Sequence, residues 1–275
     1  MESIEIKAPA KINIGLNIVS KRDDGFHNLE TIFYQIYDLF DELTFEKSDY
    51  LELILLDENK DLSKNNIIIK TIEVLEQKTG QKLTPKITLK KNIPIGAGLG
   101  GGSSDAASTL RAINKLYKLN LSLQELLEMA VKLGSDVPLF LYNHPTIGKL
   151  RGELLERINL EIKFPILLVN PGIHISTKEA FSSIIPKHNN FNYSNIQNEK
   201  IANWSKNIVN DFEVSIFKNY PKVQEIKNVL YENGALFSLM SGSGSTVYGL
   251  FESLEKAIFV GHLFPKSYFA FIGNL

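Results

Sequence analysis

The chain has 275 residues, 44% of them hydrophobic and 22% charged, with 30 basic and 31 acidic side chains and a formal net charge of -1. This composition excludes a disordered or fibrous protein, and the charge balance gives no global attraction to a nucleic acid or an anionic membrane. The sequence has no cysteine, which excludes disulfides and thiolate metal sites, and no apolar run reaches the roughly 18 residues of a transmembrane helix, so we expect a cytoplasmic protein.

The first half of the chain mixes predicted strands and helices. Alternating or β-branched apolar residues predict strands over residues 4–8, 12–20, 41–47, 50–57 and 86–90. Three helices are also predicted. The first is capped by Asn65 or Asn66, the second follows a glycine-rich stretch near residue 100, and the third runs from its cap at Ser122 to a stop at Gly134.

The second half predicts a different order of elements. The expected elements are a strand over 164–170, a helix from Thr177, a helix over 222–232, strands over 235–240 and 245–251, a helix over 254–260 and a strand over 267–272. Residues 185–207, rich in Asn and Ser, are interpreted as an inserted loop with a short helix beyond it. Without this insertion the order is β-α-β-β-α-β, which is the split βαβ order of ferredoxin-like domains.

The length of the chain predicts two domains. We place the boundary between about 145 and 160, which gives domains over residues 1–152 and 153–275. Because predicted helices and strands are mixed in the first half and the second half has the ferredoxin-like order, the expected fold class is α+β.

The strongest single feature is the segment PIGAGLGGGSSDA at residues 94–106, with five glycines in seven residues. Such a run costs backbone entropy and gives the core nothing to pack, so it predicts that something approaches the main chain closely. A strand leads in and a helix leads out, and amides at the helix start with the hydroxyls of Ser103 and Ser104 then form a phosphate cradle. A flexible hinge or a glycine-rich start of a helix is the alternative.

Three other glycine-rich loops fit less well. The spacing Gly96-x-Gly98-x-x-Gly101 satisfies the dinucleotide fingerprint, but that fold needs a strand with an acidic end after one helix, and a second helix follows here. A Walker A loop needs a lysine, and the segment 96–105 has none. The loop of protein kinases leads to VAIK and HRD signatures, which this sequence lacks.

Four groups of motifs, in order along the chain, resemble the GHMP small-molecule kinases, a family that includes galactokinase and the homoserine, mevalonate and phosphomevalonate kinases. They are APAKINIGL at 8–16 with KRDDGFH at 21–27, the glycine segment at 94–106, LGSDVP at 133–138 and SGSGS at 241–245. The resemblance implies an N-terminal ATP domain with the ribosomal protein S5 domain 2-like fold and a C-terminal ferredoxin-like domain. The triple glycine is typical of the members that act on a cytidine-diphosphate-linked methylerythritol.

The resemblance also implies a reaction. It implies ATP-dependent phosphorylation of the 2-hydroxyl of 4-diphosphocytidyl-2-C-methyl-D-erythritol in the non-mevalonate isoprenoid route. The Mg²⁺ that accompanies ATP is expected on phosphate oxygens and a loop hydroxyl such as Ser104. The protein is expected to work as a monomer or homodimer. Two alternatives stay open: a sister kinase for another small alcohol, and a nucleotide-binding module that has lost catalysis.

The resemblance assigns roles to particular residues of this chain. Asp136 matches the catalytic aspartate, and Lys11 matches its neighbouring lysine, which keeps the carboxylate ionised so that it accepts the hydroxyl proton. Phe26 and Phe181 match the two positions that sandwich the cytosine, and His27 matches the position that reads its edge. The residues matched to the nucleotide are Asn66, Pro94, Gly96, Gly98, Leu99, Gly100, Gly101, Gly102, Ser103 and Ser104, and those matched to the rest of the acceptor are Asn13, Thr177, Gly242, Ser243 and Gly244.

Each of these residues also has an ordinary structural explanation. Asp136 suits a turn in which the carboxylate bonds its own backbone, and Lys11 suits a lysine that reaches out from a strand edge. Asn66 suits a helix cap, and residues 242–244 suit a hairpin turn. The two phenylalanines suit core packing, because the chain has 16 of them.

Two positions depart from the family pattern. Phe26 stands where tyrosine is common, so a hydroxyl contact is lost while stacking is retained. Leu150, within GKLRGE at 148–153, stands where the family usually has glycine. For that reason no role is carried over to the stretch 148–153.

Overall fold

The computed structural model describes residues 3–56, 66–182, 184–186 and 191–275. The chain divides into two compact units. The first unit comprises Met1–Ala10, Leu39–Ile95 and Gly100–Asn143, and the second comprises Lys11–Asp38, Gly96–Leu99 and His144–Leu275. Two long strands that pair with each other, β1 (Ser3–Lys21) and β2 (His27–Lys47), contribute residues to both units.

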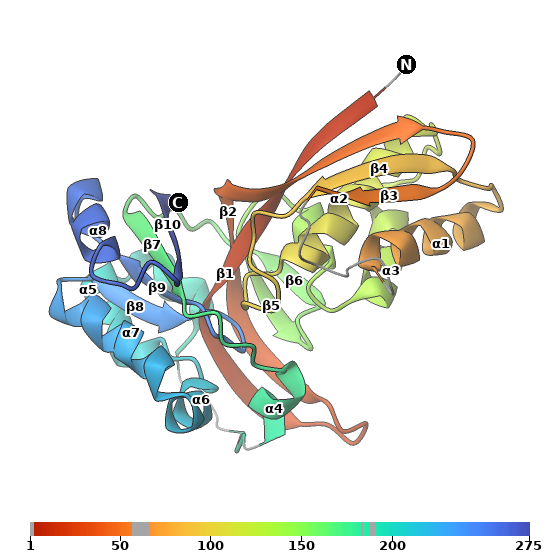
Figure 1. Cartoon of the computed structure of the whole chain (residues 1–275). Helices are drawn as coiled ribbons and strands as arrows, with labels where there is room; N and C mark the ends of the chain where they lie inside the picture. The colour runs from red at the N-terminus through yellow and green to blue at the C-terminus, as the bar shows by residue number, and fades with distance from the viewer. Residues whose placement is uncertain (1–2, 57–65, 183, 187–190) are drawn as a thin grey trace. The chain divides into compact units, whose positions relative to one another are not determined.

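The first unit is built from strands and three helices. Strand β4 (Pro85–Lys90) pairs antiparallel with the C-terminal part of β2, and β3 (Glu52–Leu55) pairs parallel with β4. Helices α1 (Ile67–Thr79), α2 (Gly101–Leu116) and α3 (Leu123–Leu133) pack on one another, and the short 3-10 helix η1 (Pro138–Leu141) packs on α2 and α3. Figure 1 shows α1 and α2 close to β3 and β4.

Local capping explains where two of these helices begin. The Asn66 side chain accepts a hydrogen bond from the Ile68 backbone N–H at 2.9 Å, which confirms it as the cap of α1. Ser122 and Glu125 form a capping box at the start of α3, and Gly134 is the C-cap residue of that helix. The sequence therefore predicted both helices correctly.

The second unit contains a four-stranded antiparallel sheet in the order β10-β7-β9-β8. Its strands are β7 (Pro165–Asn170), β8 (Phe237–Met240), β9 (Val247–Leu250) and β10 (Phe269–Asn274). Helix α7 (Pro221–Glu232) packs on β8 and β9, and α8 (Leu254–Gly261) packs on β7 and β10. This is the ferredoxin-like arrangement that the predicted order of elements indicated.

The second unit also contains two strands that add to the sheet of β2 and four short helices. Strand β5 (Thr146–Leu150) pairs antiparallel with the N-terminal part of β2, and β6 (Leu154–Arg157) pairs with β5. The other helices are α4 (Thr177–Ser182), η2 (Tyr193–Asn198), α5 (Ile201–Asn207) and α6 (Glu213–Asn219). Strands β5 and β6 and the 3-10 helix η1 were not predicted from the sequence.

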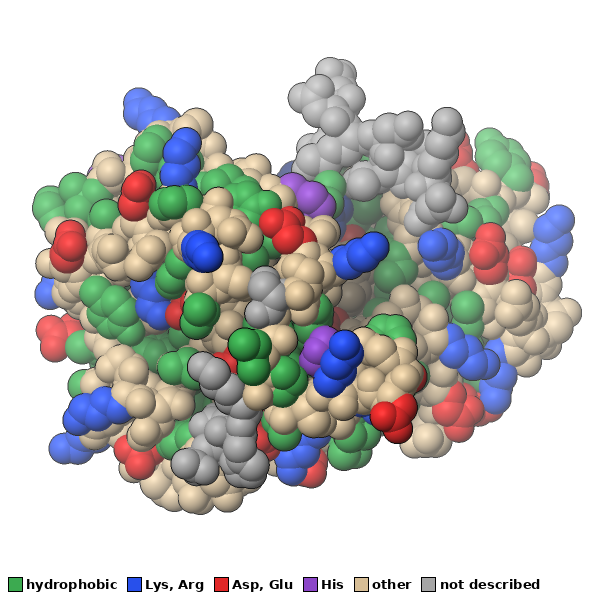
Figure 2. All heavy atoms as spheres, turned by 90° about the horizontal axis from the view of Figure 1, so that it is seen from below, with side chains coloured by type: hydrophobic (Ala, Val, Ile, Leu, Met, Phe, Trp, Pro, Cys, Tyr) green, Lys and Arg blue, Asp and Glu red, His purple; other side chains and the backbone are tan. Residues whose placement is uncertain are grey.

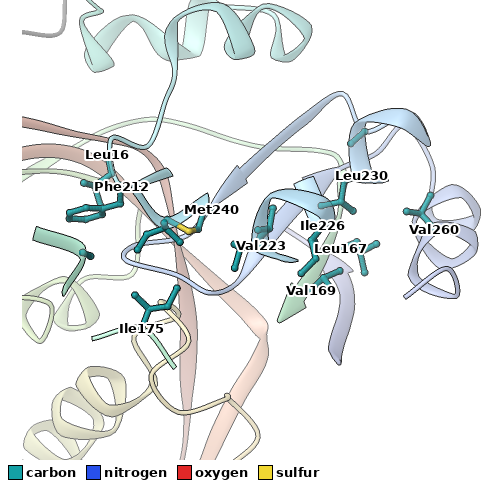
Figure 3. Packing of buried hydrophobic residues seen from close by; sticks show 14 of the residues in the cluster. Leu16, Leu167, Val169, Ile175, Phe212, Val223, Ile226, Leu230, Met240 and Val260 are labelled. Atoms are coloured by element: carbon teal, nitrogen blue, oxygen red, sulfur yellow. The ribbon is translucent and has the colours of Figure 1, made fainter. Parts of the chain in front are cut away.

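Apolar residues from strands and helices form one core cluster in the second unit. Figure 3 shows Leu167 and Val169 of β7 close to Ile226 of α7, with Val260 of α8 at one end of the group. Met240 of β8 lies toward the other end. Each of these side chains is at most 2% exposed, and burial of one such side chain contributes roughly 1.5–3 kcal/mol. The apolar strand predicted at 164–170 therefore supplies the centre of this core.

The segment 185–207 is not an inserted loop in its described part. Tyr193, Ile196 and Trp204, which lie in η2 and α5, are at most 2% exposed. The Tyr193 hydroxyl donates a hydrogen bond to the Asn17 side chain, and the Trp204 ring packs edge-on against Phe237 at 5.4 Å. The loop prediction was wrong because the many Asn and Ser residues masked these three apolar positions. Residues 187–190 lie outside the described part of the chain.

The strand predictions failed mainly along β1 and β2. The strands expected at 4–8 and 12–20 form one continuous strand, and β2 begins at His27 rather than near residue 41. Residues 31–36 of β2 are all buried, so they lack the alternation that marks a half-buried strand.

The end of the first unit at Asn143 lies near the expected boundary, although residues 11–38 and 96–99 belong to the second unit. The domain limits 1–152 and 153–275 stay a prediction.

Charges are distributed evenly on the surface drawn in Figure 2. Lysine and arginine side chains lie among aspartate and glutamate side chains on this face. This distribution agrees with the formal net charge of -1. Within the described residues, no helix is both long enough and apolar enough to cross a lipid bilayer.

Candidate active site

Every second residue from Gly96 to Gly100 of the glycine loop adopts a left-handed backbone conformation. Gly96, Gly98 and Gly100 have φ angles of 65°, 79° and 73°, a region that favours glycine. Gly100 is the N-cap residue of α2, and this helix start has no side-chain cap and no acidic residue in its first turn. Its amides and the positive end of the helix dipole therefore suit an anionic ligand.

The first turn of α2, in the first unit, has room for such a ligand. A Cβ added to Gly102 would meet no heavy atom within 4 Å, whereas one added to Gly101 would lie 3.1 Å from the Ile93 side chain. The Ser104 hydroxyl is buried and has no hydrogen-bond partner among the described residues. Open space at Gly102 and an unpartnered buried hydroxyl fit a phosphate group with its cation.

A buried ion triad lies beneath this helix start. The Lys91 ammonium contacts Asp41 and lies 2.7 Å from Asp105, and all three side chains are at most 6% exposed. The other oxygen of Asp41 accepts the backbone N–H groups of Asn92 and Ile93 at 2.7 and 2.9 Å. The triad therefore links the C-terminal part of β2 and the lead-in of the glycine loop to the N-terminal part of α2.

Burial raises the pKa of the Asp105 carboxyl to about 7, with Lys91 opposing this rise and Asp41 adding to it. Burial alone would lower the pKa of Lys91, but the two carboxylates outweigh it and raise the pKa of Lys91. Both shifts have one explanation: two carboxylates share one ammonium, so the ammonium stays charged and one carboxyl takes up a proton most readily.

Residues 96–99 of the glycine loop pack within the second unit. The Leu99 carbonyl accepts the Lys11 backbone N–H at 2.9 Å, and the Gly98 carbonyl accepts the Ser241 hydroxyl at 2.9 Å. A Cβ on Gly98 would lie 2.1 Å from the Ser241 carbonyl oxygen, so the loop and the turn after β8 approach more closely than a side chain permits. A Cβ on Gly242 would likewise lie 3.3 Å from the Gly98 carbonyl oxygen.

Lys11 and Asn13 of β1 join this cluster of the second unit. The Lys11 ammonium donates to the Asn13 side-chain oxygen at 2.6 Å, and both residues are at most 3% exposed. The Asn13 amide nitrogen donates to Thr31 at 3.0 Å, and the Asn13 backbone N–H donates to the Ser241 hydroxyl at 3.3 Å. The structure thus brings together four predicted residues, Lys11, Asn13, Gly98 and Gly242, which the sequence spreads over more than 200 positions.

Asp136 lies in the first unit, in a turn after α3. The Val137 backbone N–H donates to the Gly134 carbonyl at 3.2 Å and closes this turn, and Asp136 is partly buried. The turn that its sequence context suggested is therefore present. Because Lys11 belongs to the second unit, the pairing of Lys11 with Asp136 stays a prediction.

The predicted acceptor residues lie in the second unit. The His27 ring stacks on Phe181 with 5.0 Å between ring centroids, and Phe181 meets Phe212 edge-on at 4.8 Å. Burial lowers the pKa of His27, and the nearby Lys21 lowers it further. Phe26 is 50% exposed. Thr177 is the first residue of α4 and is exposed.

The remaining predicted residues are placed as follows: Pro94 is partly buried, Leu99 is buried, Ser103 and Ser243 are partly buried, and Gly244 is buried. The structure also adds residues that the sequence did not suggest. Ser241 lies in the SGSGS motif but was not assigned a role. The triad partners are 14 and 50 positions from Lys91 in the sequence, so no local pattern reveals them. Arg151 lies over the Phe26 ring in the stretch where the sequence departs from the family.

Comparisons with known proteins agree with this fold and motif set. Two family models match the chain, "GHMP kinases N terminal domain" over residues 66–144 and "GHMP kinases C terminal" over residues 193–268. A 4-diphosphocytidyl-2-C-methyl-D-erythritol kinase of Bacteroides fragilis is 41% identical, covering 90% of this chain and 92% of the relative. One of Chlorobium chlorochromatii is 39% identical, covering 96% and 94%.

Solved structures agree as well. A crystal structure of 4-(cytidine 5'-diphospho)-2C-methyl-D-erythritol kinase has 30% identity and a TM-score of 0.84, and the match covers 98% of each chain. Homoserine kinase from Cytophaga hutchinsonii, with 18% identity and a TM-score of 0.72, shares the fold. The expected α+β GHMP kinase fold is confirmed. With relatives of this identity over nearly its whole length, the chain belongs to the GHMP kinase family of small-molecule kinases.

Proposed function

We propose that this kinase transfers the γ-phosphate of ATP to the 2-hydroxyl of 4-diphosphocytidyl-2-C-methyl-D-erythritol, in the non-mevalonate route to isoprenoid precursors. Relatives that carry the name of that kinase share 39–41% identity with the chain over at least 90% of its length. The observation that carries the proposal is the glycine loop, which leads from left-handed glycines into an uncapped helix start. Such a backbone cradle suits the phosphates of a nucleotide.

ATP bound at the loop supplies the phosphoryl group, and its Mg²⁺ offsets charge on the phosphates. The amides of residues 101–103 bind phosphate oxygens, because the first turn of a helix leaves these donors without intrahelical acceptors. Ser104 is the candidate protein ligand for Mg²⁺. Among the described residues, no group of three His, Asp or Glu side chains could hold a metal ion, so the remaining Mg²⁺ ligands would be phosphate oxygens and water.

In this proposal, Asp136 accepts the proton of the acceptor hydroxyl, and Lys11 keeps Asp136 ionised and oriented. An ammonium close to a carboxylate favours its charged form, which is the form that accepts a proton. The hydrogen bond from Lys11 to Asn13 holds the ammonium in a fixed direction. Phosphoryl transfer demands chiefly such positioning, since in-line geometry and charge stabilisation supply most of the rate.

The aromatic residues of the second unit bind the cytosine. Phe26 offers an exposed ring and Phe181 a partly buried one, and stacking on ring faces suits a flat base. His27 reads the edge of the base. Asn13, Thr177 and the turn 242–244 bind the sugar-like part and the diphosphate, and Asn66 adds a contact on the adenine side besides capping α1.

The substrate test is a comparison of acceptors. With ATP and Mg²⁺ present, ADP formation should be fast with the cytidyl-methylerythritol and at background level with mevalonate, homoserine or galactose. Preference for another alcohol would identify a sister kinase, and Phe181→Ala would then leave acceptor affinity unchanged. ATP binding without turnover on any of these acceptors would identify a nucleotide-binding module without catalysis. We further expect a cytoplasmic protein that is a monomer or a homodimer. Gel filtration with light scattering would determine its oligomeric state.

A further inference from the structure

The turn between β5 and β6 holds an arginine against an aromatic ring of the proposed acceptor site. The guanidinium carbon of Arg151 lies 3.9 Å from the centroid of the Phe26 ring. A cation over an aromatic face is attracted by the ring quadrupole, and the planar guanidinium also stacks on it. Half of Phe26 is exposed, so this contact lies at the surface of the second unit and not in its core.

The backbone of this turn is tightly fixed. Leu150 has a φ of 61°, which a side chain such as leucine rarely adopts and which persists only where surrounding contacts enforce it. The Gly152 backbone N–H donates to the Lys149 carbonyl at 3.0 Å, and the Arg151 backbone N–H donates to the Glu153 carboxylate at 2.8 Å. The Arg151 side chain therefore leaves the chain from a defined position.

The neighbouring turn between β1 and β2 fixes the ring that Arg151 covers. Strand pairing places Leu29 opposite Leu150, which brings the two turns close together. Asp24 accepts the Phe26 backbone N–H at 3.1 Å and pairs with Arg22 at 2.9 Å. The charge of Arg22 is thus matched by a carboxylate within its own turn.

The Arg151 guanidinium forms no salt bridge over the described parts of the chain, and Glu153 accepts the Arg151 backbone N–H instead. Its charge does act on Asp24, whose pKa is lowered first by the hydrogen bond from Arg22 and to a smaller extent by Arg151, but that carboxylate is paired with Arg22. The N–H donors of a guanidinium lie in its plane, so stacking on the Phe26 ring leaves them available for hydrogen bonds. A planar set of such donors matches the oxygens of a phosphate group.

We infer that Arg151 is a further acceptor-binding residue, whose guanidinium pairs with the diphosphate of the nucleotide-linked acceptor while its face rests on Phe26. This inference rests on the proposed function, since it assigns the cytosine to the ring beside the arginine. A nucleoside diphosphate offers a flat base and an anionic group joined by one ribose, and the stacked pair Phe26–Arg151 offers an aromatic face and a cation side by side. Stacking pre-orients the long side chain, so less rotamer freedom is lost on binding.

The test compares two ligands that differ in the diphosphate. Cytidine and cytidine diphosphate are titrated calorimetrically into the wild-type chain and into Arg151→Gln. The variant should bind cytidine diphosphate roughly tenfold more weakly, the size expected for one exposed charged hydrogen-bonding group. Its affinity for cytidine should change by no more than about twofold, because the neutral ligand has no group for the guanidinium to pair with.

Arg157→Gln is the matched control. Arg157 lies on β6 and is exposed, so this variant loses the same charge near the same hairpin and should bind both ligands as the wild type does. Arg151→Lys keeps the charge without the planar donors and should recover part of the lost affinity.

Each other outcome overturns the inference in a recognisable way. Equal weakening of cytidine and cytidine diphosphate by Arg151→Gln would show that the arginine only supports the ring. Unchanged affinity for cytidine diphosphate would show that it contacts no phosphate. A wild-type chain that binds neither ligand would overturn the proposed acceptor itself and the inference with it, whereas the first two outcomes leave the proposed function intact.

Discussion

Replacing Lys91 with methionine should destabilise the chain by about 3–5 kcal/mol, the range found when one partner of a buried ion pair is removed. Lys91 serves two carboxylates that are at most 4% exposed, Asp41 in contact and Asp105 at 2.7 Å. Methionine has a similar length and fills the space, so the loss reflects the two carboxylates left without a cation and not a cavity.

The loss should depend on pH. The pKa of Asp105 is raised to about 7, so its folded state binds a proton more tightly than the unfolded state. Stability from this proton is present below the ordinary value of 3.8 and is lost as pH rises through about 7. Without Lys91 the deprotonated form becomes still less favourable, so the variant should lose more stability at pH 8 than at pH 5.5.

The assay is guanidinium chloride unfolding followed by circular dichroism at both pH values. Lys90→Met is the matched control, because the adjacent Lys90 forms an ion pair with Glu42 in which the side chains are 49% and 47% exposed, and such pairs contribute about 1 kcal/mol or less. Adding Asp105→Asn to Lys91→Met should restore part of the loss. Equal effects of Lys90→Met and Lys91→Met, or a loss with no pH dependence, would refute the reasoning.

Three further predictions concern the site and the second unit. Asp136→Asn should lower kcat by about 10²–10⁴-fold and leave ATP affinity nearly unchanged, because it removes a base without changing the glycine loop. Near-normal turnover in steady-state kinetics would reject the role of Asp136 as the base. Gly98→Ala should lower the melting temperature more than Gly172→Ala. Both glycines have a φ near 75°, but only a Cβ added at Gly98 would meet another atom within 4 Å. Equal shifts in melting temperature would contradict the close approach of Gly98 to Ser241. The pKa of Glu213 is raised by burial despite its 2.6 Å pair with Lys227, so Glu213 adds stability below its ordinary pKa of 4.5 that is lost as pH rises through the raised value. Urea midpoints of wild type and Glu213→Gln should therefore diverge between pH 4.5 and 7.5, and parallel midpoints would argue against the shift.

The sequence predicted the elements whose signals are local. The cap at Asn66, the capping box of Ser122 and the apolar run of β7 each lie within a few residues of the structure they cause. The N-terminal part of β2 was not predicted as a strand, because burial on both faces removes the alternation of apolar and polar residues on which strand prediction depends. The burial of Trp204 and Tyr193 was not predicted because Asn and Ser residues surround them in the sequence and their partners, Phe237 and Asn17, lie far from them along the chain.

The same distinction holds for the candidate site. The glycine loop was visible because its composition is unusual over seven residues, and its left-handed glycines follow from that composition. The Lys91 triad depends on contacts across 14 and 50 residues, and the contact between Arg151 and Phe26 depends on the pairing of β2 with β5. Such contacts arise from tertiary structure, so spacing along the chain does not predict them.

The central claim is that the glycine loop presents ATP to the 2-hydroxyl of a cytidine-diphosphate-linked methylerythritol. Phosphorus-31 NMR of the purified chain with ATP, Mg²⁺ and this acceptor tests it most directly. The account predicts that a new phosphomonoester signal grows in step with ADP and that neither grows when the acceptor is omitted. ADP that appears together with inorganic phosphate, or no reaction with the acceptor present, would contradict it.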